Sequence, residues 1–391
     1  MSLYSRRGVS AQKEDVHQAT QKLDAGLYPF AFCKIYKDYL GGDDNWVNLM
    51  HADGAGTKSV LAYLYWKETG DVSVWEGIAR DAIAMNLDDL LCVGIYDNLL
   101  FSSTIDRNKQ LIPGEILEAI INGSQRFFEE LTTFGVGVKY LGGETADLGD
   151  VVRTITVNGT MTARWPKNKL VTNEKIRVGD VIVGLASYGR SSYESEYNSG
   201  IGSNGLTSAR HDILEHSYAL NFTESFDNSL DQGVVYIGPH RLLDEVTIPG
   251  HPSMDVGRLL LSPTRTYAPL MAALLQEFFE QIHGLVHCSG GGQTKCLKYL
   301  PGNFTIIKDN LFDPPPIFEL IRESSGADTR EMYQVFNMGH RLEVFTNRAD
   351  ADEIVALSKS LGIDAQVVGR VEEGDRKELL LQVGGESIRY V

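Results

Sequence analysis

Hydrophobic positions in the first 165 residues alternate between strand-like and helix-like spacing. Val47–His51 has the short apolar pattern of a strand, and a stripe of apolar residues at helical spacing follows Thr57. Two more helices are predicted, one from Val74 onward and one opened by Pro113, and residues 155–163 alternate as a strand with one solvated face. This half therefore predicts a sheet accompanied by helices.

A polar stretch from Trp165 to Arg177 interrupts the pattern before a second alternation of strands and helices begins. It opens with Val181–Ala186, an apolar run typical of a buried strand. Further helices are predicted over Leu206–Leu214, through Leu270, Leu274, Phe278 and Ile282, and through Ile354, Leu357 and Leu361 with a stop at Gly362, and a turn at Gly374–Asp375 separates two final strands. We predict an α+β or α/β chain with mixed sheets and flanking helices, divided into domains at residues 1–170 and 171–391.

Composition narrows the class of protein without changing this architecture. The chain has 391 residues, 43% hydrophobic and 23% charged, and its formal net charge of −16 argues against a nucleic-acid partner, because it repels phosphate backbones. No apolar run reaches the roughly 18–20 residues that span a bilayer, and the N-terminal segment lacks the apolar core of a secretory signal. The four cysteines show no CxxC spacing and are expected to be reduced. We expect a cytoplasmic enzyme without a membrane partner.

The first chemical cluster is Asp53–Lys58, which closes a predicted strand and opens a helix. Gly54 and Gly56 let the backbone approach a ligand closely, and the free N–H groups at the helix start favour an anion. Lys58 can pair with a phosphate and Asp53 can hold a metal ion that bridges phosphates. A tight turn with an exposed lysine explains the same residues, so spacing alone leaves both interpretations open.

Two acidic clusters follow in the same half. Asp81, Asp88 and Asp89 lie about two turns apart on one predicted helix, either as a solvated acidic face or as a cluster that a cation compensates. Residues 142–147 (GGETAD) follow a short apolar strand, where glycines and a carboxylate suit a ligand or metal site at a sheet edge. Oxygen ligands without nearby histidine or cysteine sets indicate magnesium rather than zinc.

Three glycine-containing loops lie in the second half. Residues 200–205 read GIGSNG, but a polar stretch separates them from their strand, so a mobile loop over substrate is favoured over a dinucleotide site. Gly290–Gly292 leads into a segment with two lysines, and this pattern predicts a phosphate-binding site. His287 stands just before it, either as a core histidine or as a catalyst. Residues 337–339 form a further loop whose signal is weak alone.

These clusters, in this order, resemble the phosphoribosylformylglycinamidine cyclo-ligase family, also called the aminoimidazole ribonucleotide synthetases. Residues 53–58 are similar to the family's DGVGTK, 88–90 to its NDL, 142–146 to its GGETA, 203–205 to its SNG, 262–267 to its APTRxY, 290–292 to its GGG and 332–339 to its MYxxFNxG. DGxGTK together with GGETA is the specific pair, and the similarity spans nearly the whole chain.

The resemblance implies a homodimer whose N-terminal sheets join, a C-terminal α/β domain, and the use of ATP with magnesium and, in some cases, potassium. The implied reaction phosphorylates the formyl amide oxygen of formylglycinamidine ribonucleotide and closes the imidazole ring of aminoimidazole ribonucleotide in purine biosynthesis. We expect catalytic roles for Lys58, Asp53 and His287, ATP contacts from Gly54, Gly56, Thr57, Lys58, Gly142, Gly143 and Thr145, ribonucleotide contacts from Ser203, Asn204, Gly205, Gly290, Gly291, Gly292 and Asn337, and magnesium ligation by Asp53, Asp89 and Glu144.

The chain also departs from the family pattern. Gly202 stands where the family has a histidine, Ser102 where an aspartate is expected, and His340 where a small residue follows FNxG. Residues 191–198 are additional sequence. Two alternatives therefore stay open: another ATP-using enzyme of the superfamily with a different phosphoryl acceptor, and a nucleotide-binding paralogue without turnover. His287 and His340 are the two candidates for replacing the missing histidine.

Overall fold

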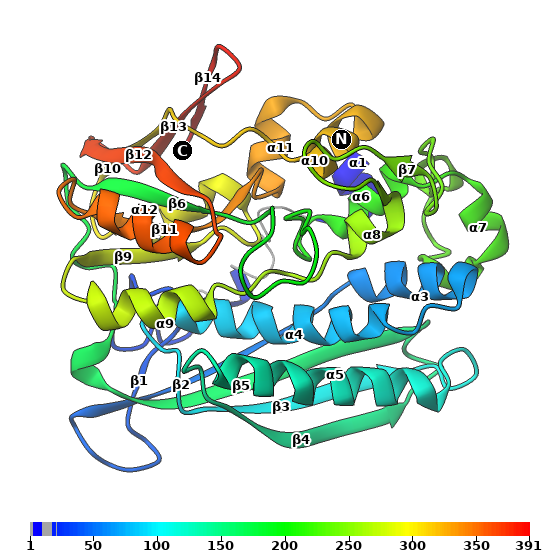
Figure 1. The fold of residues 1–391 in the computed structure, drawn as a ribbon, viewed down its shortest axis with the longest axis horizontal. Helices are drawn as coiled ribbons and strands as arrows, with labels where there is room; N and C mark the ends of the chain where they lie inside the picture. The colour runs from blue at the N-terminus through cyan, green and yellow to red at the C-terminus, as the bar shows by residue number, and fades with distance from the viewer. Residues whose placement is uncertain (1–2, 10–17, 21) are drawn as a thin grey trace.

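The computed structural model describes residues 3–9, 18–20 and 22–391, which form two layered halves stacked on each other (Figure 1). The elements of the first half are β1 (Tyr36–Lys37), β2 (Trp46–Gly54), α3 (Lys58–Thr69), α4 (Val74–Leu91), β3 (Leu99–Arg107), α5 (Gly114–Thr132), β4 (Val138–Asp147) and β5 (Ile155–Pro166), while α1 (Leu3–Arg6) lies against the second half (Figure 1). Its five-stranded sheet has the order β1-β2-β5-β3-β4, with β3 and β4 parallel and the other pairs antiparallel.

The second half is built on a seven-stranded mixed sheet of order β14-β13-β10-β12-β6-β11-β9. Its strands are β6 (Val181–Ala186), β9 (Ile282–His287), β10 (Phe304–Lys308), β11 (His340–Thr346), β12 (Ala365–Glu373), β13 (Glu378–Val383) and β14 (Glu386–Tyr390), and a small hairpin joins β7 (Glu245–Val246) to β8 (Met254–Asp255). Its helices are α6 (Leu206–Ile213), α7 (Ser217–Asn221), α8 (Val256–Leu261), α9 (Ala268–Glu277), α10 (Pro316–Ser325), α11 (Thr329–Val335) and α12 (Ala351–Ser360), with 3₁₀ segments at Lys167–Lys169, Thr223–Ser225, Gln232–Val234 and Gly292–Tyr299.

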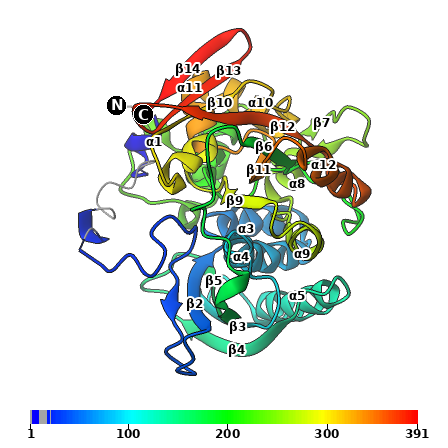
Figure 2. The same ribbon diagram turned by 90° about the vertical axis from the view of Figure 1, so that its left-hand side faces the viewer.

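Helix α4 lies between the two halves and is buried along almost its whole length. It packs on β2 and β5 below, beside α5, and against α8 and α9 of the second half (Figures 1 and 2). A helix that is covered on all sides is usually apolar all round, but α4 also buries Asn86 and three aspartates. Polar groups on α4 must therefore find partners inside the protein.

The expected fold class is confirmed, with mixed sheets and flanking helices in both halves. Two element predictions were wrong. The helix through Leu270 ends at Glu277, and Ile282 begins β9 instead, because a short apolar run does not distinguish a helix from a buried strand. A third final strand, β14, follows a two-glycine turn at Gly384–Gly385 with positive φ at both positions. The predicted domain boundary near residue 170 stays a prediction.

The cysteines and the helices agree with the expectations from composition. All four cysteines are buried and unpaired. Within the described part of the chain, no helix combines the length and the apolarity that crossing a lipid bilayer requires.

Candidate functional site

The three loops of the second half converge at the end of its sheet nearest α4. A Cβ on Gly205 would lie 2.3 Å from the ring of Phe336, and one on Gly290 would lie 3.3 Å from the Asn204 amide nitrogen. A Cβ on Gly292 would meet the Phe336 carbonyl oxygen at 2.5 Å. The predicted ribonucleotide-binding loops therefore lie against one another, and the close approaches at Gly205 and Gly292 require glycine.

Asn337 fastens these loops through hydrogen bonds to two other segments. Its side chain is buried, accepts a hydrogen bond from Ser187 Oγ at 2.9 Å, and donates one from Nδ2 to the Gly200 carbonyl at 2.8 Å. Its own carbonyl accepts from Gln293 Nε2 at 2.6 Å. Asn337 thereby ties the loop at 200–205 to the segment after Gly292, and its expected contact with the ribonucleotide stays a prediction.

The Asp53–Lys58 cluster lies where expected, at the end of β2 and the start of α3, and it meets the second half. Thr57 Oγ1 and Thr207 Oγ1 of α6 are hydrogen-bonded at 2.9 Å. The predicted ATP loop and the loop at 203–205 are thus neighbours across the junction of the halves. Such a junction is where small-molecule sites commonly form.

Lys58 is fully buried and does not lie on the surface of this loop. Its ammonium donates to Asp81 Oδ1 at 2.9 Å and to the Ser262 carbonyl at 2.5 Å, while Thr264 donates to the same Asp81 oxygen from both its N–H and its hydroxyl. Burial lowers the pKa of Lys58 and raises that of Asp81, and the attraction between the two charges opposes both shifts. Lys58 therefore joins α3, α4 and the 262–264 segment, and its contact with a phosphate stays a prediction.

Asp88 is the second buried carboxylate of α4 and is compensated from the other half. Thr266 Oγ1 donates to its Oδ1 at 2.6 Å, and Arg341 Nη2 lies 3.5 Å from its Oδ2. Arg341 also donates from Nε to His287 Nε2 at 3.1 Å and from Nη2 to the Arg265 carbonyl. Because a guanidinium only donates, His287 Nε2 must be the unprotonated nitrogen of a neutral ring.

Asp89 is held between two imidazoles. His287 Nδ1 donates to its Oδ1 at 2.6 Å, and His51 Nε2 lies 3.0 Å from its Oδ2. Burial alone would raise the pKa of Asp89, but the hydrogen bonds from His287 and His51 outweigh it and hold that pKa well below its usual range. The three aspartates of α4 are therefore buried and compensated by other side chains of the protein. The interpretation as a solvated acidic face was wrong.

His51 differs from His287 because both of its nitrogens face oxygen acceptors. Nδ1 lies 3.3 Å from Asn86 Oδ1, and the Asn86 amide nitrogen is committed to carbonyls that include those of Ala82 and Asp53. Burial lowers the pKa of His51, but its contacts with Asp89 outweigh this and leave the pKa raised. Asp89 therefore separates a neutral histidine from one that favours the protonated form.

The three expected magnesium ligands do not form one donor set within the chain. Both oxygens of Asp89 are engaged by histidines, and Asp53 Oδ1 accepts from the Gly54 N–H at 2.7 Å. Glu144 lies on β4, three strands and about 14 Å from β2 by strand spacing, beside the exposed Thr104. Gly142, Gly143 and Thr145 share this exposed edge strand. The residues present do not fit a magnesium site made by one chain, and we assign none.

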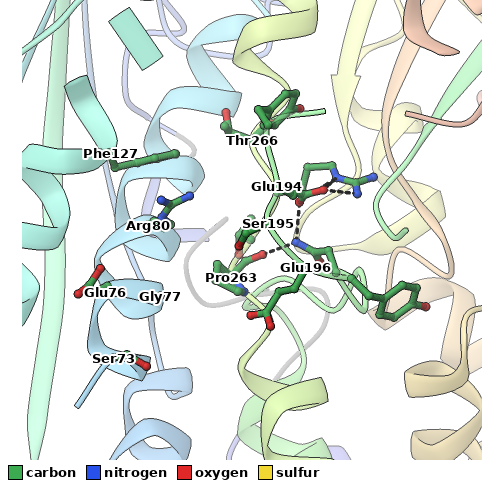
Figure 3. Close-up of a pocket in the computed structure, with 15 residues that line it drawn as sticks. Ser73, Glu76, Gly77, Arg80, Phe127, Glu194, Ser195, Glu196, Pro263 and Thr266 are labelled. Atoms are coloured by element: carbon green, nitrogen blue, oxygen red, sulfur yellow. Dashed lines mark hydrogen bonds and ion pairs between the residues drawn. The ribbon is translucent and has the colours of Figure 1, made fainter. Parts of the chain in front are cut away.

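A cavity of about 310 Å³ adjoins this buried network on the outer side of the 263–266 segment. Helix α4 contributes Glu76 and Arg80 from one side, with Ser73 just before it, and the additional segment 193–198 lines the other (Figure 3). Glu194 of that segment accepts from Arg265 at 2.5 Å. Thr264 lines the cavity and also donates to Asp81. The additional segment, on the opposite wall of this cavity, is therefore close to the buried network.

Sequence reasoning missed His51 and Arg341. His51 stands two residues before Asp53 in a β-strand and carries no motif of its own. Arg341 is a charged residue inside a strand whose seven residues are all buried, but the sequence patterns did not predict that strand. Of the two histidines considered as replacements, His340 turns away toward Glu343 at 3.1 Å, and burial lowers its pKa. It is Arg341, not His340, that lies below Gly202.

Comparison with known proteins identifies the class of protein. Residues 36–165 match the model of the N-terminal domain of AIR synthase related proteins, and residues 177–382 match that of their C-terminal domain. A phosphoribosylformylglycinamidine cyclo-ligase of Methanocaldococcus jannaschii is 29% identical over 87% of this chain and 81% of its own, and one of Methanococcus vannielii is 30% identical over 82% and 76%. The chain belongs to the AIR synthase related proteins and, within them, to the phosphoribosylformylglycinamidine cyclo-ligase family. Enzymes of this family are ligases that form a carbon–nitrogen bond, and so is this one.

Solved structures show the same fold at low sequence identity. A HypE–HypF complex aligns with 16% identity over 98% of this chain and 99% of that chain, at a TM-score of 0.56. Thiamine monophosphate kinase from Aquifex aeolicus aligns with 12% identity over 97% and 98%, at a TM-score of 0.52.

Proposed function

We propose that this enzyme closes the imidazole ring of aminoimidazole ribonucleotide from formylglycinamidine ribonucleotide at the expense of ATP, in purine biosynthesis. The observation that carries the proposal is the match of both domain models in order, together with cyclo-ligase relatives that align over more than four fifths of the chain. The convergence of the motif loops on α4 supports it, because these segments are far apart in sequence.

The reaction has two steps. The formyl oxygen attacks the γ-phosphorus of ATP, and ADP leaves. The amidine nitrogen then attacks the formyl carbon, the oxygen departs with inorganic phosphate, and loss of a proton completes the ring. Holding both groups of one substrate in the required orientation favours the second step, and positive groups near the transferred phosphoryl favour the first.

The chain's own residues supply the orientation. The Asp53–Lys58 loop is proposed to receive the phosphates of ATP, and the loops at 203–205 and 290–292 the ribonucleotide. The neutral His287 is placed to position Asp89 and Arg341. Two structures of the same fold support nucleotide use: AaThiL was solved with AMPPCP and TMP, and Thermotoga maritima PurL, at a TM-score of 0.50, with FGAR. Magnesium and potassium remain expectations without assigned ligands.

We further propose a cytoplasmic homodimer with domains at residues 1–170 and 171–391. The N-terminal sheet supports the dimer, since α4 and α5 cover one face while the other carries exposed Met50, Leu100 and Leu141 (Figure 2). Thr162 stands between Met50 and Leu100 across the sheet, so these apolar side chains are exposed among polar ones on a face that no helix covers. Glu144 lies on the same exposed side of the sheet.

Incubation of purified protein with ATP, magnesium and formylglycinamidine ribonucleotide tests the proposed reaction. ADP, phosphate and aminoimidazole ribonucleotide should appear in equal amounts. Phosphoryl transfer to another acceptor without imidazole formation would instead support a different enzyme of the superfamily. Tight ATP binding without turnover of any acceptor would support a non-catalytic paralogue.

A further inference from the structure

Arg341 is a buried cation whose hydrogen-bonding capacity is not used up. The side chain is 2% exposed, its Nε and Nη2 are engaged by His287, Arg265 and Asp88, and its guanidinium lies 5.3 Å from the ring centre of Tyr267. Nη1 has no hydrogen-bond partner among the described residues. An unmet charged donor inside a protein costs free energy, so its presence calls for an explanation.

An irregularity in the backbone of β11 sets the direction of the Arg341 side chain. In the pairing of β11 with β6, His340 is opposite Ala186 and Leu342 is opposite Leu185, so Arg341 is the extra residue of a β-bulge. A bulge re-aims a side chain and is frequent beside active sites. Here it points the guanidinium at the loop that carries the SNG motif.

Gly202 of that loop leaves the space over Nη1 open. It has φ +68°, and a Cβ at this position would meet only Arg341, with Nη1 at 3.6 Å and Cδ at 4.0 Å. The next three residues, at 203–205, are partly exposed, so the guanidinium lies one residue layer below solvent. Ser203 Oγ is also buried without a partner.

The covering loop is fastened at its ends and not in its middle. Ser199 Oγ donates to the Leu259 carbonyl at 2.7 Å, Asn337 holds the Gly200 carbonyl, and α6 begins at Leu206. Among the described residues, no side-chain hydrogen bond holds residues 202–204, and Ser203 Oγ has no partner. The loop can therefore lift from Nη1 without breaking its anchors.

We propose that Arg341 is a phosphoryl-binding residue of the site: its Nη1, with Ser203 Oγ beside it, receives a phosphoryl oxygen of the ligand when the loop at 202–204 moves. We call the position beside Arg341 Nη1 and Ser203 Oγ the seat. The identity of its ligand rests on the proposed function, but the existence of the seat does not. Guanidinium groups suit phosphate oxygens because their donors form a rigid fork. The phosphoryl group belongs either to the ribonucleotide or to the triphosphate of ATP.

Substitutions at Gly202 test the seat without removing the guanidinium. Gly202→Asp places a carboxylate against Nη1 and satisfies it internally, while Gly202→Asn has the same shape without the charge, and both residue types tolerate positive φ. Binding of inorganic phosphate, ribose 5-phosphate and a non-hydrolysable ATP analogue is measured by calorimetry. Gly326→Asn, at φ +66° in open space, is the matched control for backbone strain.

We expect G202D to weaken binding of one probe by about tenfold or more, the factor of a charged hydrogen bond, with G202N intermediate and the control unchanged. Arg341→Lys, which keeps the charge beside Asp88 but removes Nη1, should show the same selective loss. An effect on ribose 5-phosphate assigns the seat to the ribonucleotide, and an effect on the ATP analogue assigns it to the triphosphate. Equal binding by wild type, G202D and G202N, or no binding of any probe, would overturn the proposal.

Turnover and phosphate binding together distinguish a failure of the proposed function from a failure of the proposed seat. If the wild-type protein forms no imidazole but G202D still loses a phosphate probe, the seat stands and the substrate assignment falls. If imidazole forms at the wild-type rate in G202D and its phosphate binding is unchanged, the seat falls alone.

Discussion

At the scale of single residues, the site is governed by buried charges that are paired across the junction of the halves. Asp89 shows this most clearly, because one imidazole beside it is neutral and the other favours protonation. The raised pKa of His51 means that its protonated ring stabilises the fold fully below the unfolded value of about 6.5, and that this contribution is lost as pH rises through the folded value. Asp89 has a depressed pKa, so its contribution is lost only in acid.

His51→Gln should therefore remove part of the pH dependence of stability. Between pH 6 and 9, the wild-type free energy of unfolding should fall through the titration of His51, and the variant, which keeps a hydrogen-bond donor but does not titrate, should lose that slope. Urea unfolding at a series of pH values measures both. Identical slopes in the two proteins would show that His51 does not titrate with the fold.

The Lys58–Asp81 pair makes a second prediction at this scale. Lys58→Met leaves a carboxylate buried without its cation, and breaking such a pair costs about 3–5 kcal/mol of stability. Adding Asp81→Asn should restore much of it. The double variant then separates structure from chemistry: low turnover in a stable protein supports a catalytic role of Lys58, and near-normal turnover would limit that residue to the fold.

At the scale of elements, the loops converge because glycines permit contacts that no other residue allows. Gly205→Ala combines positive φ of +82° with a Cβ only 2.3 Å from the Phe336 ring. We expect a loss of about 2–4 kcal/mol in stability, from left-handed strain and overpacking together. Gly326→Ala, with φ +66° and open space, should lose only the strain, about 1–2 kcal/mol. Thermal unfolding measures both losses. Equal losses of stability in the two variants would show that the Phe336 contact is easily relieved.

At the scale of the whole molecule, local patterns predicted most elements but not the contacts among them. Val181–Ala186 is observed with the predicted bounds, and the helices after Thr57 and Val74 lie where apolar spacing placed them. The burial of Lys58, by contrast, depends on a segment about 200 residues away. The separation of Glu144 from Asp53 depends on strand order, which a motif does not contain.

The proposed dimer is also a property of the whole molecule. Aspartate in place of Met50 or Leu141, which are 71% and 60% exposed on the N-terminal sheet, puts a charge into the proposed interface and should yield monomers. Leu220→Asp, at a 73% exposed position on α7, is the control and should leave the mass unchanged. Light scattering reports the mass. A monomeric wild-type protein, or dimers in all three variants, would contradict the proposed interface.

The proposed reaction phosphorylates the formyl oxygen of the substrate before the ring closes. Substrate carrying ¹⁸O in its formyl group tests this most directly, by mass spectrometry of the inorganic phosphate released during turnover with ATP. The proposed chemistry predicts one ¹⁸O atom in each phosphate formed together with an imidazole. Unlabelled phosphate alongside the same amount of imidazole would contradict it.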